Sequence, residues 1–175
     1  ICCAGPAQGK SYYIASTEVT ADVRTDGSMH VREVRTFVFS GEFHAVDRFV
    51  VPPPGTRIEG IAVTENGAAH REALGELPGT WYTKPDGDRL QITWAFAATD
   101  ETRTFALDFD LIGAVVKHAD YAELYWQFVG KEWGVRSETA LVTLNLPPLV
   151  PKAEIEAWAH GPLWGDVEIG ESRVT

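Results

Sequence analysis

The sequence predicts an all-β fold, an antiparallel β-sandwich of the immunoglobulin-like or jelly-roll-like kind with little helix. Three observations support this prediction. Apolar and polar residues alternate with a period of two along most of the chain, turn-forming dipeptides separate the alternating runs, and the aromatic content of 11% is high. About eight to ten strands at such spacing are typical of a sandwich or a barrel. A sandwich is favoured, because its two inner faces use strands that are apolar on one face only.

The first two predicted strands form a hairpin. The alternating run at residues 19–23 ends at Asp26-Gly27. This dipeptide favours a type I′ turn, in which both central residues have positive φ. The chain returns through residues 29–39, and Gly41 interrupts the pattern.

Further turn signals separate the later strands. The Pro52-Pro53-Pro54-Gly55 segment must leave the sheet, because proline cannot donate a ladder hydrogen bond. Asn66-Gly67 is a second hairpin dipeptide, and only residues 68–77 and 118–123 are suited to a short helical turn. The remaining predicted strands cover residues 49–51, 58–63, 90–96, 105–111, 124–129 and 140–146.

The same alternation predicts which side chains lie inside the sandwich. Glu33 falls on the inward face of its strand together with apolar neighbours. A buried carboxylate is costly unless it is paired, so we expect an ion pair with Arg35 or Arg48. A catalytic acid is the less favoured alternative for this residue. The predicted core residues are Trp94, Phe105, Leu107, Phe109, Val142 and Leu144.

The chain divides into three regions. Residues 1–10 are interpreted as a signal-peptide remnant or flexible tail, because small residues follow a short apolar start that holds both cysteines, Cys2 and Cys3. Residues 11–150 form the main sandwich, and residues 151–175 add further strands or begin a second β unit. No window approaches the roughly 18 consecutive apolar residues that span a bilayer. We therefore expect an exported, extracytoplasmic domain.

The charge balance restricts the expected partners. Fifteen basic and 25 acidic side chains give a formal net charge of -10. An acidic surface repels nucleic-acid phosphates and anionic lipid headgroups. A protein or a cell-envelope ligand is therefore the expected partner, and nucleic acid is not.

The sequence contains no recognised catalytic motif. It has no phosphate-binding glycine loop, no Gly-x-Ser-x-Gly elbow and no His-Glu-x-x-His pair. Two groupings, His44 with Asp47 and His118 with Asp120 and Glu123, are interpreted as surface or hydrogen-bonded residues, because lone histidines are rarely metal ligands. We therefore predict no catalytic residue, no metal site and no cofactor.

Residues 121–133 are rich in aromatic side chains. In a strand, Trp126 and Phe128 share one face, and Tyr125 lies on the other. We predict that the first two anchor the core, while Glu123 and Tyr125 lie near an interaction surface, a role that suits an amphipathic ring. The alternative is a purely structural strand in which Tyr125 is bonded internally.

Several short motifs of the chain carry a family resemblance. They are Ser11-Tyr12-Tyr13-Ile14, the run from Asp26 to Glu33, Phe39-Ser40-Gly41-Glu42-Phe43, Arg103-Thr104-Phe105, Asp120-Tyr121-Ala122-Glu123-Leu124-Tyr125-Trp126, Leu146-Pro147 and Ala159-His160-Gly161. With these motifs, the chain from about Ser11 onward resembles the bacterial predicted membrane proteins called domain of unknown function 2207 (YciQ-like). The resemblance implies an N-terminal signal, an extracytoplasmic β domain, then transmembrane helices and a cytoplasmic tail, so membrane contact is expected only through those other segments. It implies no activity, ligand or catalytic residue.

These observations favour a non-enzymatic extracytoplasmic domain that senses or binds a ligand or protein. A carbohydrate- or cell-wall-binding module is the alternative, supported by the aromatic content. A carboxylate-dependent hydrolase and a structural spacer are less favoured. A sugar-binding module predicts solvent-facing Trp or Tyr rings, and an enzyme predicts a cleft in which ionisable groups converge.

Overall fold

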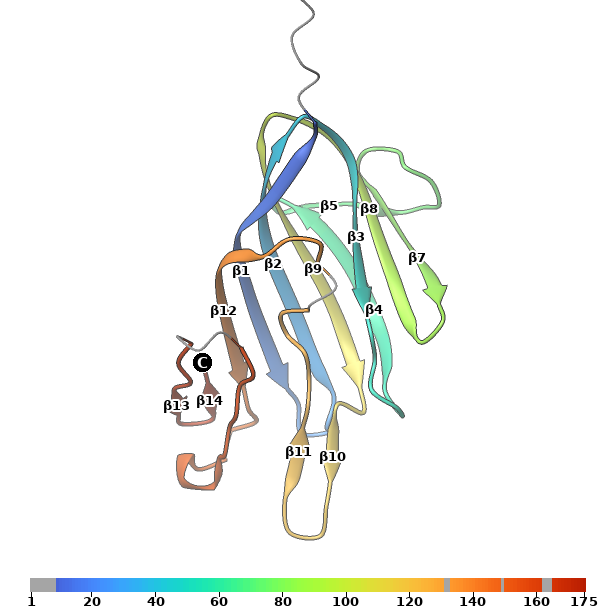
Figure 1. Ribbon diagram of the computed structural model, residues 1–175. Helices are drawn as coiled ribbons and strands as arrows, with labels where there is room; N and C mark the ends of the chain where they lie inside the picture. The colour runs from blue at the N-terminus through green and yellow to red at the C-terminus, as the bar shows by residue number, and fades with distance from the viewer. Residues whose placement is uncertain (1–8, 131–132, 149, 162–164) are drawn as a thin grey trace, which may run out of the picture.

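Two β-sheets face each other across an apolar core, and the predicted all-β sandwich with little helix is confirmed (Figure 1). The computed structural model describes residues 9–130, 133–148, 150–161 and 165–175. The expected signal-type segment with Cys2 and Cys3 lies outside these residues. Within the described residues the helical element is a single turn of 3-10 helix at Lys152–Glu154, and no helix is long and apolar enough to cross a membrane.

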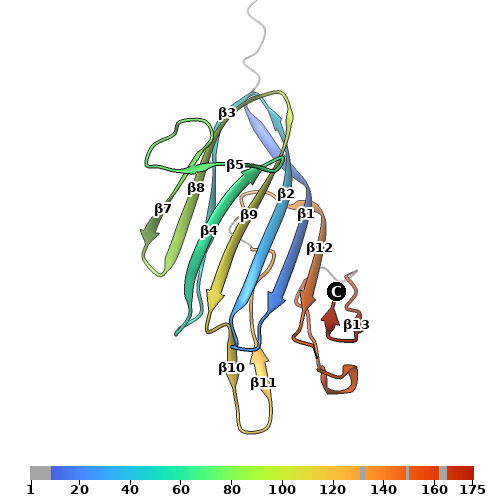
Figure 2. The ribbon, with the colours of Figure 1, turned by 180° about the vertical axis from the view of Figure 1, so that it is seen from behind.

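The larger sheet has eight strands, and β1, β2 and β9 form its centre (Figure 1 and Figure 2). The hairpin of β13 and β14 joins this sheet through β12. The domain boundaries expected near residues 10 and 150 stay predictions. In sheet order the strands are β13 (Ile169–Gly170), β14 (Arg173–Val174), β12 (Ser137–Asn145), β1 (Ser11–Val23), β2 (Met29–Ser40), β9 (Thr102–Ile112), β4 (Arg57–Glu65) and β5 (Ala68–Ala69).

The smaller sheet lies over one side of the larger sheet, away from β12 (Figure 1 and Figure 2). A separate two-stranded hairpin, β10 (Val115–Lys117) with β11 (Ala122–Leu124), extends beyond the ends of both sheets. The smaller sheet consists, in order, of β3 (Glu42–Val50), β8 (Arg89–Thr99), β7 (Thr80–Asp86) and β6 (Arg71–Glu72).

Most strand pairs are antiparallel as predicted, but two pairs are parallel. β12 runs parallel to β1 in continuous register from Ser16↔Thr139 to Asp22↔Asn145, and β6 runs parallel to β7. β12 is added beside the N-terminal strand after the chain has passed through both sheets. An alternating pattern specifies which face of a strand is buried but not the direction of its neighbour.

The two hairpin dipeptides form different turns. Asn66 and Gly67 both have positive φ, 48° and 84°, as a type I′ turn requires. At Asp26-Gly27 the predicted type I′ turn is wrong, because only Gly27 has positive φ. The Asp26 carboxylate accepts hydrogen bonds from the Ser28 amide and hydroxyl at 2.9 and 2.7 Å. These side-chain hydrogen bonds keep the φ angle of Asp26 negative, and Gly27 alone takes the left-handed conformation.

The predicted core is confirmed at its centre. Trp94, Phe105, Leu107 and Phe109 are at most 3% exposed. Val142 and Leu144 are only half-buried, which differs from the prediction. They lie on β12, toward the margin of the larger sheet that the smaller sheet does not cover (Figure 1).

The strand predicted at residues 124–129 is wrong after its first residue. Leu124 ends β11, and the described residues of segment 125–136, namely 125–130 and 133–136, lie along the inner face of the larger sheet without forming a strand (Figure 1). Burial still alternates here, since Tyr125 and Gln127 are exposed while Trp126 and Phe128 are half-buried. The side chains therefore fill the uncovered part of the core, although the described backbone of this segment has no strand partner.

Candidate functional site

A buried group of three charged side chains lies between the two sheets. β2 directs Glu33 and Arg35 inward, and β3 contributes Arg48 from the opposite sheet. Arg48 donates to both carboxylate oxygens of Glu33, at 3.2 Å from Nε and 3.0 Å from Nη2, and Arg35 Nη1 also donates to Glu33. All three side chains are at most 4% exposed. The predicted pairing of Glu33 is confirmed with both arginines.

The environment of this ion triad shifts the pKa values of Glu33 and Arg35. Burial alone would raise the pKa of Glu33, but the charges and hydrogen bonds of Arg48 and Arg35 outweigh burial and lower that pKa. The pKa of Arg35 is lowered by burial and by repulsion from Arg48, against the attraction of Glu33. Two cations and one anion leave the triad with one excess positive charge. Arg35 Nε and Nη2 have no hydrogen-bond partner among the described residues.

The aromatic segment 125–136 covers the ion triad. The Arg35 guanidinium carbon lies 4.6 Å from the Trp133 ring centroid, and that of Arg48 lies 5.9 Å from it. These are cation–π distances, so Trp133 partly offsets the excess positive charge. Gly130 passes so close that a Cβ atom there would lie 2.8 Å from Arg48 Nη1. The segment is therefore fitted to the two arginines beneath it.

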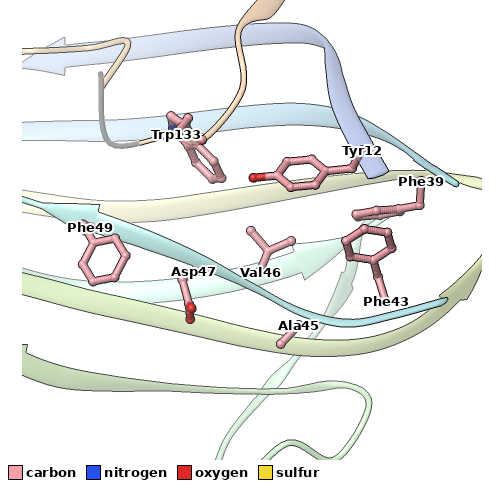
Figure 3. A pocket seen from close by; sticks show the side chains of 9 residues that line it. Tyr12, Phe39, Phe43, Ala45, Val46, Asp47, Phe49 and Trp133 are labelled. Atoms are coloured by element: carbon pink, nitrogen blue, oxygen red, sulfur yellow. The ribbon is translucent and has the colours of Figure 1, made fainter. Parts of the chain in front are cut away.

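A pocket of about 260 Å³ opens beside the triad. Trp133 lines this pocket and also lies over Arg35 of the triad (Figure 3). The Tyr12 hydroxyl points toward Trp133, and burial raises the pKa of Tyr12 (Figure 3). Asp47 is the one charged residue among those that line the pocket, and it accepts a 2.6 Å hydrogen bond from the Thr93 hydroxyl. The lining residues are Tyr12, Phe39, Phe43, Ala45, Val46, Asp47, Phe49, Trp133 and Gly134.

The predicted interaction residues lie elsewhere, Glu123 on the β10–β11 hairpin and Tyr125 directly after it. Tyr125 is 73% exposed, and Glu123 is exposed on β11. Glu123 lies 3.2 Å from His118 Nε2, and the His118 ring stacks on Tyr121 with centroids 4.3 Å apart. Tyr125 is not held inside the domain, so its interaction role stays a prediction.

The histidine groupings weighed from the sequence are resolved in part. His44 lies 3.5 Å from Glu42 rather than beside Asp47, and both side chains are exposed. His118 contacts Glu123 as described above. Among the described residues, no group of three or more His, Cys, Asp or Glu side chains lies together in a way that could hold a metal ion.

The pocket itself was missed by sequence reasoning. Its walls come from β1, the β2–β3 corner and the segment before β12, which are far apart in the chain. One signal was present. By alternation, apolar residues occur on both faces of the strand at residues 43–49, Phe43, Ala45 and Phe49 on one and Val46 on the other, which differs from the one-sided pattern of a strand with one solvated face.

Comparisons with known proteins identify a family but no characterised relative. A family model described as predicted membrane protein (DUF2207), N-terminal domain, matches residues 13–173. No curated protein matches.

Solved structures resemble the chain only weakly. A candidate nutrient-binding protein from Legionella pneumophila is 14% identical with a TM-score of 0.40, covering 57% of this chain and 39% of that one. An M1 zinc metallopeptidase from Deinococcus radiodurans is 13% identical, with a TM-score of 0.44 and coverage of 93% and 38%. A candidate protease from Parabacteroides distasonis is 8% identical, with a TM-score of 0.40 and coverage of 93% and 34%. This chain thus spans less than two fifths of each of these proteins.

Proposed function

Because the chain belongs to the DUF2207 family of predicted membrane proteins, we propose that it is the extracytoplasmic, non-enzymatic domain through which such a protein binds a ligand or partner. The export signal inferred at residues 1–10 supports the extracytoplasmic side. The aromatic pocket beside β3 is the observation that carries the binding function.

The pocket has the composition of a binding site. Five aromatic rings supply apolar contact area, and one carboxylate, that of Asp47, lies at the margin on the face of β3 opposite Val46 (Figure 3). Catalysis by a pair of carboxylates requires two of them facing one space, and Asp47 is the single carboxylate among the lining residues. Binding without chemistry is therefore the function that this pocket supports best.

Trp133 offers a route by which binding is sensed. It lines the pocket on one side and lies over Arg35 on the other. A ligand that displaces Trp133 would also remove its cation–π contact with the buried triad. Occupancy of the pocket would thereby alter the packing of segment 125–136, which leads directly into β12.

Carbohydrate or cell-wall binding is the second candidate function. The exposed rings on and after the β10–β11 hairpin favour it, since Tyr121 and Tyr125 are 57% and 73% exposed. Such rings stack on the apolar faces of sugars. This function would use the hairpin, whereas the leading proposal uses the pocket, so variants at the two sites separate them.

The location is tested in the full-length protein. Cys2 and Cys3 are replaced by Ser, and a single cysteine is placed at the exposed position Thr20. A membrane-impermeant maleimide should label this cysteine in intact cells. Labelling that appears only after the cells are opened would overturn the extracytoplasmic assignment.

The binding function is tested on this chain with isotope-labelled protein and two defined probes, a mixture of soluble heptapeptides and chitotetraose. Amide shifts at Phe43, Asp47 and Trp133 are expected with one of them. Shifts confined to the hairpin with chitotetraose would favour the second candidate, and no shift with either would overturn both.

The Tyr125→Ala variant separates the two sites. Because the ring is exposed, the free energy of unfolding should change by less than about 0.5 kcal/mol. Probe binding at the pocket should be unchanged, and any chitotetraose binding at the hairpin should be lost. A loss of stability well above this value would show instead that the ring is packed, as a structural role requires.

A further inference from the structure

We propose that the free edge of β3 is a strand-addition site for an extended basic peptide, whose Lys or Arg side chain pairs with Asp47 while its alternate, apolar side chains enter the aromatic pocket. This proposal rests on the proposed binding function and specifies its ligand class. It follows from three features of the described residues: an unpaired strand edge, a pocket that follows this edge, and the charge of its lining.

β3 differs from the other outermost strands of the two large sheets in its length and in its position beside the pocket. The others, β5, β6 and β13, are two residues long, and none of the residues that line the pocket belongs to them or to the strands next to them. β3 has nine residues, and its strand partner among the described residues is β8 alone. Its register with β8 is continuous from Ala45↔Ala95 to Val50↔Leu90. An edge of this length presents a row of backbone donors and acceptors that another strand satisfies.

The pocket follows this edge rather than one face of the strand. Ala45, Val46 and Asp47 are consecutive, so their side chains alternate between the two faces of β3, as Figure 3 shows for Val46 and Asp47. All three nevertheless line the same space. A cavity that touches three consecutive strand residues must run past the strand's edge. A peptide backbone placed there would lie beside β3 and direct alternate side chains toward Tyr12 and Trp133.

Asp47 favours a cationic side chain in the added strand. It is the one charged residue among those that line the pocket, and its carboxylate lies on the face of β3 opposite Val46 (Figure 3). The whole chain has a net charge of -10. A Lys or Arg on the Asp47 face of the added strand would meet this carboxylate, and apolar side chains on its other face would pack on the rings of the pocket. Rings of this region already contact cations, since Lys10 Nζ lies 5.2 Å from the Phe43 ring centroid and the Arg89 guanidinium lies 4.7 Å from that of Phe49.

One contact limits the length of the site. The Phe49 carbonyl already accepts a hydrogen bond from Arg48 Nη1. We therefore place the added strand along residues 43–48, opposite the part of β3 that lines the pocket. A peptide of five to seven residues is long enough to cover this stretch at about 3.3 Å per residue.

The experiment uses this chain and three short peptides. The first is acetyl-Thr-Val-Lys-Val-Thr-amide, the second has Glu in place of Lys, and the third is the Lys peptide N-methylated at alternate residues. Binding is measured by calorimetry and mapped by amide shifts. The Lys peptide should bind at least about tenfold more tightly than the Glu peptide, and N-methylation should abolish binding. The shifts should centre on residues 43–48.

Two variants separate charge recognition from a loss of fold. Asp47→Asn removes the charge but keeps an acceptor for Thr93, and it should bring the Lys and Glu peptides to similar affinity. Glu18→Gln makes the same charge change at an exposed position on β1, outside the pocket, and should leave the preference unchanged. An equal loss of preference in both variants would attribute it to net charge and overturn the proposal.

The outcomes distinguish this proposal from the function on which it rests. Chitotetraose or unrelated peptides that shift the pocket amides, without any binding of the Lys peptide, would overturn strand addition and leave the binding function standing. Concentration-dependent shifts at β3 without any peptide would show that a second copy of the chain occupies the edge. No binding of any probe would overturn both proposals.

Discussion

Two regions supply aromatic side chains to the same core: the paired strands β2 and β9, and the segment 125–136. The two regions hold these side chains in place differently. Phe37, Phe105 and Phe109 are at most 2% exposed, and each follows the strict alternation of a paired strand. Trp126, Phe128 and Trp133 are half-buried and come from a backbone without strand pairing. In the paired strands, the backbone hydrogen bonds between β2 and β9 fix the position of each ring. In the segment, the position of each ring depends on the side chains against which it packs.

The difference shows where the sandwich is adaptable. A paired strand resists displacement, because its hydrogen bonds and its packing are lost together. Segment 125–136 covers the inner face of the larger sheet through side-chain contacts, among them those of Trp133 with Phe37 and Arg35. The part of the core that borders the pocket is therefore the part held least by backbone pairing.

The largest expected effect is at the ion triad, where the two regions meet. Glu33→Gln leaves the Arg35 and Arg48 guanidiniums buried without their counterion, and should lower the free energy of unfolding by about 5 kcal/mol near pH 7. Chemical denaturation of both proteins measures this difference. A change below about 1 kcal/mol would mean that water or rearranged neighbours compensate the arginines.

The same variant has a defined pH dependence. The lowered pKa of Glu33 means that its contribution to stability is fully present above the unfolded value near 4.5 and is lost as pH falls through the lower folded value. The difference between wild type and Glu33→Gln should therefore be constant at neutral pH and shrink below pH 4.5. A difference that grows in acid would contradict the sign of this pKa shift.

A pair of tryptophan variants measures the contrast between the regions directly. Trp94 on β8 is 2% exposed, and Trp94→Ala should cost about 4 kcal/mol. Trp126 is half-buried outside any strand, with its ring 6.1 Å from Phe109, and Trp126→Ala should cost about 2 kcal/mol. Urea denaturation of both variants provides the comparison. Equal costs would show that segment 125–136 is anchored as firmly as the paired strands.

The smallest expected effect concerns two glycines of the segment. Gly130→Ala places a Cβ atom 2.8 Å from Arg48 Nη1, and should cost about 1 kcal/mol by displacing that guanidinium. Gly134→Ala is the matched control, because its Cβ would meet the Tyr12 hydroxyl at an ordinary 3.7 Å. The control should stay within about 0.5 kcal/mol of wild type. Equal free energies of unfolding for the two variants would show that Gly130 is not tightly packed against Arg48.

The sequence predicted the sandwich because burial in paired strands follows a local period that Phe105, Leu107 and Phe109 display plainly. It did not predict the irregular path after Leu124, because alternation reports burial and not the presence of a neighbouring strand. It also missed the turn at Asp26, where a side chain decides the backbone conformation.

The candidate site was predictable only where its parts lie on one strand. Glu33 stood out because a carboxylate interrupted an inward-facing run, and its partners Arg35 and Arg48 are near in sequence. The pocket joins Tyr12 and Trp133 across more than a hundred residues, and no local pattern contains that proximity. Tyr125 is exposed, as the alternation predicted. Its role in an interaction stays a prediction, because a sequence pattern does not contain the partner.

The parallel pairing of β1 with β12 has a consequence for how the chain acquires its structure. The hydroxyls of Thr17 and Ser137 lie 2.6 Å apart although 120 residues separate them in sequence. During synthesis β1 can therefore pair early with β2, whereas its other neighbour, β12, is made much later. Pairing over such separations is slow, because the closure entropy of a long loop opposes it. Until residues 137–145 emerge, one edge of β1 stays open to other chains, so β12 protects this edge from misassembly once synthesis reaches it.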